Sequence, residues 1–285
     1  MWLRYFAIFK GILNWGLFLI KKGVEAMSFR LLVGREKRGI KITIYAFLSL
    51  FLLCLSTPVM GRDAQQILED IYERQGLGAG SFVLDLQVDS VDGNETYTAY
   101  VRVYLHATKK QMVTFTNPER LTNQSFLVIA TNTWMYQKGL NRPLRISAQQ
   151  KLFGEAGIAE IAGIDYLHDY RVAKMEETAT HYQLELQALD KKVAYQQAKL
   201  WVDKDRVVVE KIILFALNGQ PLKELLYYNY RLLNGHQIAS IEIRNLLYEK
   251  AQRTVMNYLS IRGKELPEEA FDPLMMSKFQ LLVKE

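Results

Sequence analysis

Residues 82–105, FVLDLQVDSVDGNETYTAYVRVYL, contain the pattern that decides the fold. Apolar and polar side chains alternate on both sides of Asp92-Gly93-Asn94, which is typical of a hairpin turn. Because successive side chains of a strand point to opposite faces, residues 82–91 and 96–105 are predicted to form two antiparallel strands. The stretch therefore predicts a sheet that buries one face and leaves the other polar.

Strand patterns recur along the rest of the chain. The further strands that they predict are 111–116, 125–130, 133–137, 144–147, 181–189, 196–203, 206–216, 222–231, 236–248 and 252–261. The other predicted elements are a helix over 63–75, a short helix or irregular excursion over 155–168, and a helical or part-extended segment over 267–283. The chain is therefore predicted to be an α+β protein with one large curved antiparallel sheet of about ten to eleven strands and helices covering a face.

The first 61 residues differ in composition from the rest of the chain. Residues 42–55, ITIYAFLSLFLLCL, form an apolar run with basic residues before it and small residues after it. This order predicts a signal peptide over 27–61, with cleavage near Gly61 and a mature domain over 62–285. Residues 1–26 are either an interfacial amphipathic extension or the product of an upstream start codon. An uncleaved inner-membrane anchor is the alternative to cleavage.

The leader accounts for the net positive charge of the chain. The whole sequence has 36 Lys and Arg and 30 Asp and Glu, and the leader has nine and two of these, which leaves 27 bases and 28 acids for residues 62–285. The predicted mature domain is thus nearly neutral, and no nucleic-acid partner is expected. The single cysteine, Cys54, follows Leu53, which is too large for a lipidation motif, and no disulfide is expected after residue 61.

Residue patterns that carry known chemistry are missing from the sequence. It contains no G-x-S-x-G motif and no Walker A motif, and no cysteine after residue 61. Four dispersed histidines predict no metal site: His106, His168, His181 and His236. Asp165, His168 and Asp169 are close in sequence and could form an acid/base cluster, although polar loop residues are commoner than catalytic ones. We expect a protein that is not an enzyme and has no cofactor.

The order of several short motifs resembles that of a known family. The motifs are Pro118, Phe126-Leu127, Trp134-Met135-Tyr136, Arg142, Arg145-Ile146-Ser147, Gly163-x-Asp165-Tyr166, Lys199-Leu200-Trp201-Val202-Asp203 and Leu266-Pro267. Over roughly residues 64–280 the chain is similar to the outer-membrane lipoprotein-sorting proteins, relatives of the periplasmic carrier LolA. One departure is Gly163-Ile164-Asp165, where the family has Gly-Ser-Asp.

The resemblance implies a half-open β-barrel whose concave, apolar side is covered by helices and holds acyl chains. Burial of each methylene is worth ~0.8 kcal/mol, so such a cavity needs no specific polar contact. The residues expected to line the cavity are Leu84, Leu86, Val101, Val103, Phe115, Trp134 and Tyr136. Arg142 and Arg145 are expected at its rim, near an anionic headgroup. The alternative is that Trp134 and Tyr136 fill an ordinary core.

The expected function is that of a periplasmic carrier, exported through its signal peptide. It would act as a monomer and pass a lipid or lipoprotein between inner- and outer-membrane partners, driven by relative affinity. One alternative is an envelope sensor of the same fold, held by a retained anchor. A second is an enzyme on a related sheet, for which a cluster of polar groups deep in the cavity would be the sign.

Overall fold

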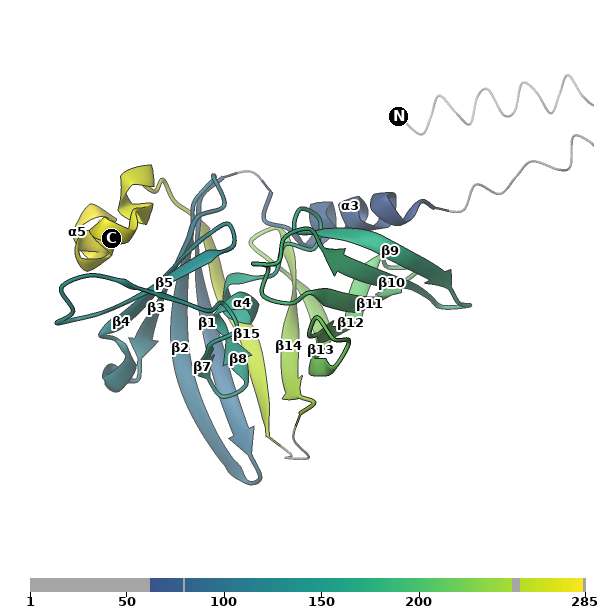
Figure 1. Ribbon diagram of the computed structural model, residues 1–285, viewed down its shortest axis with the longest axis horizontal. Helices are drawn as coiled ribbons and strands as arrows, with labels where there is room; N and C mark the ends of the chain where they lie inside the picture. The colour runs from purple at the N-terminus through teal and green to yellow at the C-terminus, as the bar shows by residue number, and fades with distance from the viewer. Residues whose placement is uncertain (1–61, 79, 248–251, 284–285) are drawn as a thin grey trace, which may run out of the picture. The chain divides into compact units, whose positions relative to one another are not determined.

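The computed structural model describes residues 62–78, 80–247 and 252–283 (Figure 1). Within the chain, Arg62–Glu285 form one compact unit. The predicted signal peptide over 27–61 and the extension over 1–26 lie outside the described residues. The leader and its cleavage near Gly61 therefore stay predictions.

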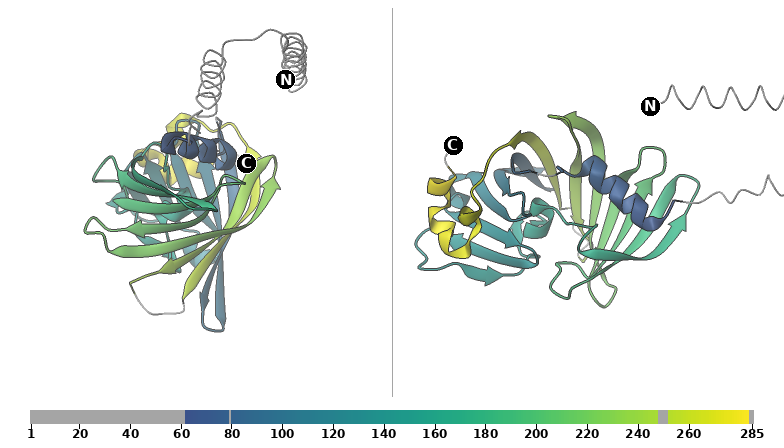
Figure 2. Two further views of the ribbon diagram at one scale, coloured as in Figure 1. Left: turned by 90° about the vertical axis from the view of Figure 1, so that its right-hand side faces the viewer. Right: turned by 90° about the horizontal axis from the view of Figure 1, so that it is seen from above.

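Thirteen strands of the described residues form one antiparallel sheet, in the order β6-β5-β4-β3-β2-β1-β15-β14-β13-β12-β11-β10-β9. They are β1 Phe82–Asp92, β2 Glu95–Leu105, β3 Gln111–Asn117, β4 Gln124–Ile129, β5 Asn132–Gln137, β6 Leu144–Ile146, β9 Tyr170–Glu177, β10 His181–Ala188, β11 Gln197–Asp203, β12 Val208–Phe215, β13 Pro221–Leu233, β14 His236–Asn245 and β15 Arg253–Gly263. The sheet is curved and open, so the predicted α+β class is confirmed (Figures 1 and 2).

The expected total of about ten to eleven strands was too low, although the twelve ranges predicted above correspond to twelve of the thirteen strands. The strand that the sequence did not predict is β9, at one edge of the sheet. Of its residues only Tyr170 is buried, because an edge strand packs on one neighbour. Its sequence, YRVAKMEE, consequently lacks the apolar alternation by which the other strands were recognised.

Short elements complete the fold. They are α3 Ala64–Gln75, η1 Glu119–Leu121, β7 Lys151–Phe153, β8 Ala156–Gly157, α4 Ile158–Ala162, η2 Glu268–Phe271, η3 Pro273–Lys278 and α5 Phe279–Leu282. The helix predicted over 63–75 is thus α3, and the excursion predicted over 155–168 contains α4. We call residues 147–169, between β6 and β9, the insert, and residues 273–283 the C-terminal segment.

The register of the first five strands decides which side chains face which side of the sheet. One row of directly opposed residues is Leu84, Val103, Val113, Phe126 and Met135. The adjacent row is Val83, Tyr104, Met112, Leu127 and Trp134. Because neighbours along a strand point to opposite faces, the two rows lie on opposite sides of the sheet.

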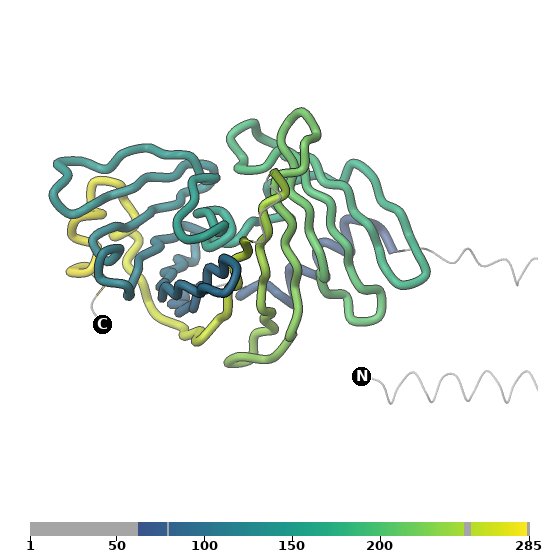
Figure 3. Tube along the Cα trace, turned by 90° about the horizontal axis from the view of Figure 1, so that it is seen from below, coloured from purple at the N-terminus to yellow at the C-terminus, as the bar shows by residue number. Residues whose placement is uncertain are grey.

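Each row belongs to a different hydrophobic cluster. The first row joins a large cluster that also takes in inward residues of β9 to β15, α3 and the insert; we call this the interior. The second row joins a smaller cluster with Leu266, Phe271, Met276 and Phe279. The C-terminal segment therefore lies against the outer face, beside β4 and β5 at one end of the sheet (Figure 3).

Candidate functional site

The interior contains five of the seven residues expected to line a cavity. They are Leu84, Leu86, Val101, Val103 and Phe115, all buried in the large cluster. β1, β2 and β3 bring them together: Leu86 lies opposite Val101, and Val101 opposite Phe115. The alternation within each strand predicted this shared face, whereas ligand binding by these residues stays a proposal.

Trp134 and Tyr136 do not belong to the interior, so the expectation that all seven residues share a face was wrong. Both pack in the smaller cluster beneath the C-terminal segment. On β5 it is Met135 that contacts the interior. The W-M-Y alternation allows either assignment. The outcome follows from the pairing of Leu127 with Trp134 and of Phe126 with Met135.

Arg142 and Arg145, the expected rim residues, are exposed. Arg142 lies in the turn between β5 and β6, and Arg145 lies on β6, at one edge of the sheet. The guanidinium of Arg145 donates a hydrogen bond to Asn132 Oδ1. Their proximity to an anionic headgroup remains a proposal.

Two short pieces of chain cover the interior. From α3, Ile67 and Leu68 are buried in it, and α3 contacts β9, β12 and β14. From the insert, Phe153, Ile158 and Ile161 are buried in it. Other apolar residues of these pieces are only partly buried: Ile71, Leu77, Leu152, Ile164 and Leu167. The cover thus consists of one helix of 12 residues and an insert with a helix of five residues, and several of its apolar side chains are only partly buried.

A buried ion pair, which the sequence analysis missed, ties the insert to the sheet. Lys223 Nζ on β13 lies 2.9 Å from Glu160 Oε2 on α4, and the two side chains are 8% and 1% exposed. Lys223 also donates to the backbone oxygen of Glu155 at 2.9 Å. The sequence could have indicated that Lys223 is buried, because it lies two residues before Leu225 and therefore on the same face of the strand.

Glu160 accepts further hydrogen bonds inside the protein. The backbone N–H of Gly157 donates to Oε2 at 2.6 Å, and the hydroxyl of Tyr195 donates to Oε1. Burial, followed by the charge of Glu160, raises the pKa of Tyr195 well above its usual value, so this phenol stays a donor. The Tyr170 hydroxyl in turn donates to the backbone oxygen of Tyr195 at 2.9 Å. Every partner of the carboxylate is thus itself fixed in the fold.

Glu155 is the second buried carboxylate of the insert. Its side chain is 5% exposed and lies 2.7 Å from Lys151 Nζ, while Asn245 Nδ2 on β14 donates to it at 2.8 Å. Its backbone N–H donates to Thr254 Oγ1 at 2.7 Å. The neighbouring Gly154 has φ +55°, and a Cβ there would lie 2.3 Å from Thr254 Oγ1. The insert can therefore approach β15 this closely only with glycine at position 154.

Polar residues at the other end of the insert connect it to the β2–β3 turn and to α3. Asp165 accepts from Lys109 Nζ at 3.0 Å and contacts His168 Nδ1 at 2.8 Å. Burial opposes ionisation of Asp165, but hydrogen bonds from His168 and Lys109 outweigh it and hold the pKa of this carboxyl below its usual value. His168 packs edge-on against Tyr72 of α3, with 5.2 Å between ring centroids. The sequence neighbours do meet, as a junction between α3, the insert and the β2–β3 turn.

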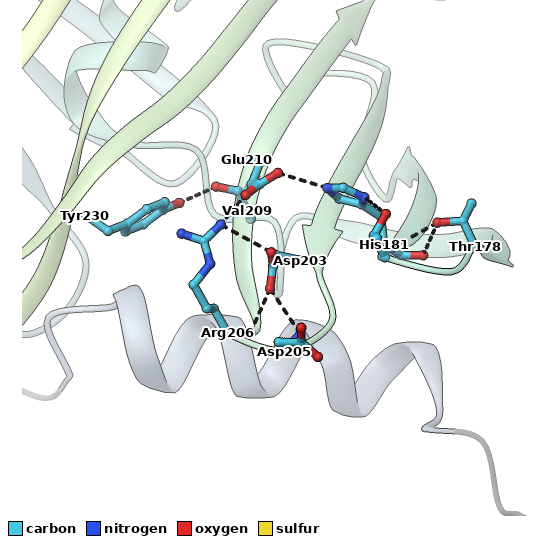
Figure 4. A network of polar contacts seen from close by, with 9 residues as sticks. Thr178, His181, Asp203, Asp205, Arg206, Val209, Glu210 and Tyr230 are labelled. Carbon is cyan, nitrogen blue, oxygen red and sulfur yellow. Dashed lines mark hydrogen bonds and ion pairs between the residues drawn. The ribbon is translucent and has the colours of Figure 1, made fainter.

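A third polar network joins β10, β11 and β12 beside α3 (Figure 4). Asp203 accepts the backbone N–H of Arg206 at 2.8 Å, and His181 Nε2 lies 2.9 Å from Glu210 Oε2. α3 joins through Arg74, which donates to the backbone oxygen of Arg206 at 3.3 Å. His181 thus acts within a surface network of β10 to β12, and no group of three or more metal-ligating side chains occurs among the described residues.

The outer face carries a hollow of about 300 Å³ between β1, β2, β3 and β15. Asp85 lies in it, 2.6 Å from Arg102 Nε and 2.8 Å from Arg262 Nη2, and Ser260 Oγ donates to it at 2.8 Å. The charges and hydrogen-bonding capacity of these groups are therefore satisfied within the hollow.

None of the helices in the described ranges is long and apolar enough to span a bilayer.

Comparison with known proteins identifies the family. A family model described as "Uncharacterized protein" matches residues 107–278, more than half of the chain. The chain belongs to this family. None of the curated proteins searched matches it.

Solved structures show that this chain shares a fold with proteins of the LolA superfamily. A LolA superfamily protein from Nitrosomonas europaea has a TM-score of 0.67 at 22% identity, with 74% of this chain and 98% of that chain covered. An outer membrane lipoprotein-sorting protein domain from Vibrio parahaemolyticus has a TM-score of 0.59 at 22% identity, with 73% and 95% covered. A DUF1329 family protein from Desulfovibrio piger has a TM-score of 0.58 at 14% identity, with 73% and 95% covered. The expected LolA-like fold is therefore confirmed.

Proposed function

We propose that this protein is an envelope carrier, which binds the acyl chains of a lipid or lipid-modified protein in the interior and passes them between membrane partners. The observation that carries the proposal is that only two short pieces of the described chain, α3 and the insert, cover that apolar interior. Five wall residues of β1 to β3 share one cluster with buried residues of α3 and of an insert whose own helix, α4, has five residues. The likeness of the fold to LolA superfamily structures supports the same function.

Acyl chains would take the place of the insert. Leu86 and Val101 are each 1% exposed and Val103 is fully buried, so the wall is in contact with other side chains in the closed form. A bound chain must therefore displace apolar residues of the insert, such as Ile158 and Ile161. Because Glu160 lies on the same helix, this displacement also disturbs the buried Lys223–Glu160 pair, and the ligand must offset that loss. Each additional methylene that leaves water contributes ~0.8 kcal/mol.

The proposed function includes no reaction. The buried Lys223–Glu160 pair and the Lys109–Asp165–His168 junction each tie the cover to the sheet, and both have the partners that such a role requires. Transfer would follow relative affinity, with the cargo moving to the partner that holds it more tightly. The sensor alternative depends on an anchor in residues 1–61, which lie outside the described residues.

Native mass spectrometry of residues 62–285, followed by titration with a fluorescent fatty acid, tests the proposal. We expect co-purified lipid and saturable binding. Phe115→Ala in the interior should weaken binding, whereas Trp134→Ala on the outer face should not. Circular dichroism verifies that both variants are folded. If the wild-type domain binds no acyl probe, the carrier proposal is wrong; if Trp134→Ala alone weakens binding, the ligand lies on the outer face.

A further inference from the structure

Exposed apolar side chains gather at the end of the sheet where β5, β6 and the C-terminal segment lie. Leu274 and Leu281 are 77% and 75% exposed. Leu140 and Leu144, in the β5–β6 turn and on β6, are 36% and 44% exposed, and Met275 is 38% exposed. We call this set the end surface.

The fold accounts for the position of these residues. The C-terminal segment turns Met276 and Phe279 against the outer face of the sheet, together with Trp134 and Tyr136 of β5. Val283 is buried in the same cluster, and Leu274, Met275 and Leu281 are left exposed. The β5–β6 turn continues from β5, and Figures 1 and 3 show this turn and the C-terminal segment at the same end of the molecule.

The charge of the end surface has one sign. Residues 121–154 contain Lys138, Arg142, Arg145 and Lys151 but no acid, and residues 273–283 contain Lys278 but no acid. Lys151 pairs with Glu155 at 2.7 Å. Within the described ranges, no carboxylate lies within ion-pair distance of the other four bases.

Two of the nearest acids in sequence have roles within the fold, whereas the exposed Glu269 has no ion-pair partner among the described residues. Glu268 pairs with Lys110 at 2.7 Å. Asp272 caps η3, where its Oδ1 accepts the backbone N–H of Leu274 at 2.7 Å. The end surface therefore combines exposed leucines with four bases that have no ion-pair partner among the described residues, a combination that favours an anionic, apolar partner.

We propose that the end surface docks on an anionic lipid bilayer. Leu274, Leu281 and Leu140 enter the boundary between headgroups and acyl chains, and the bases lie near lipid phosphates. A protein partner is disfavoured because leucine is under-represented in binding hot spots, where Trp and Tyr dominate. Here Trp134 and Tyr136 pack beneath the C-terminal segment instead. This docking goes beyond the proposed carrier function, since the C-terminal segment that provides Leu274 and Leu281 packs on the outer face and not in the interior.

Flotation with lipid vesicles tests the proposal, with residues 62–285 used because they form a compact unit. We expect the domain to float with vesicles of phosphatidylglycerol and phosphatidylethanolamine at low salt, and to stay in solution with phosphatidylcholine alone. Each base near an anionic surface is worth about fivefold in partitioning, so Arg142→Gln with Arg145→Gln should lower binding ~30-fold. Leu274→Ser with Leu281→Ser should lower it at least about tenfold.

Matched variants elsewhere on the surface provide the controls. Lys191→Gln with Lys192→Gln removes two exposed charges, and Leu189→Ser with Leu217→Ser removes two leucines that are 62% and 70% exposed. Neither control should change flotation. Equal losses in the controls would overturn the proposal, as would a wild-type domain that stays in solution; the latter result would favour an acidic protein as the partner. Phe115→Ala should float normally, so failure of the carrier function and of docking can be told apart.

Discussion

Individual residues of the insert decide how firmly the interior is covered. Lys223 and Glu160 are both charged groups removed from water, and such a pair contributes less to stability than the loss of one partner costs. The main effect of the pair is therefore to fix the position of α4, because the Glu160 carboxylate needs the positive charge of Lys223 when it is buried.

Lys223→Met should lower the free energy of unfolding by ~3–5 kcal/mol, because Glu160 then stays buried without its counter-charge. Adding Glu160→Gln should recover part of that loss, since a neutral amide can still accept from Gly157 or Tyr195. Urea unfolding of residues 62–285 measures both. A single variant as stable as the wild type would contradict the assigned ion pair.

The Asp165 junction predicts a pH dependence of stability. Its pKa is held below the usual 3.8, so its stabilisation is complete above about pH 4 and is lost as the pH falls through the lowered value. Asp165→Asn should therefore destabilise the domain at neutral pH, by ~1 kcal/mol, and the difference from the wild type should shrink toward about pH 3. Urea unfolding at several pH values tests this. The exposed Asp205→Asn serves as control, and a difference that grows on acidification would refute the assignment.

At the scale of elements, the C-terminal segment depends on the side chains of β5 and on little regular structure of its own. η3 and α5 together span ten residues, too few for an independently stable helix. Their position follows from burial of Met276 and Phe279 against Trp134 and its neighbours. Phe279 also meets Tyr104 edge-on, with ring centroids 4.9 Å apart.

Trp134→Ala should free the C-terminal segment while the sheet stays folded. We expect a loss of about 1–3 kcal/mol, below the ~3–5 kcal/mol of a fully buried aromatic, because Trp134 is only partly buried. Limited proteolysis should then cut residues 264–283 faster than in the wild type. Phe115→Ala should instead destabilise the sheet without selective cutting there, and equal cutting in both variants would argue against the two-cluster description.

At the scale of the whole molecule, the sheet encloses one apolar interior and carries a second cluster on its outer face. If the interior is the ligand site, an acyl ligand stabilises the folded domain by mass action. When the concentration of free ligand is 100 times the Kd, the free energy of unfolding increases by ~2.7 kcal/mol. Thermal unfolding with increasing fatty acid should show a rising Tm in the wild type and in Trp134→Ala, and a smaller rise in Phe115→Ala. A Tm that does not change with the fatty-acid concentration would argue against binding in the interior.

The sequence by itself determined the local structure of this protein. Period-two alternation predicted most strands, and placed Leu84, Leu86, Val101 and Val103 on shared faces, because strand geometry links sequence spacing directly to side-chain direction. It also predicted α3 from its helical spacing. These are properties of neighbouring residues, and they need no knowledge of what the strand pairs with.

The tertiary structure alone decided which face became the interior. The alternation in β5 is compatible with either orientation, and the pairing of Leu127 with Trp134 turned the aromatics outward, toward a segment more than 130 residues later in the chain. Lys223 and Glu160 likewise meet across 63 positions. Such contacts depend on register and on the closing of long loops, whose free energies are set by the whole fold rather than by the local sequence.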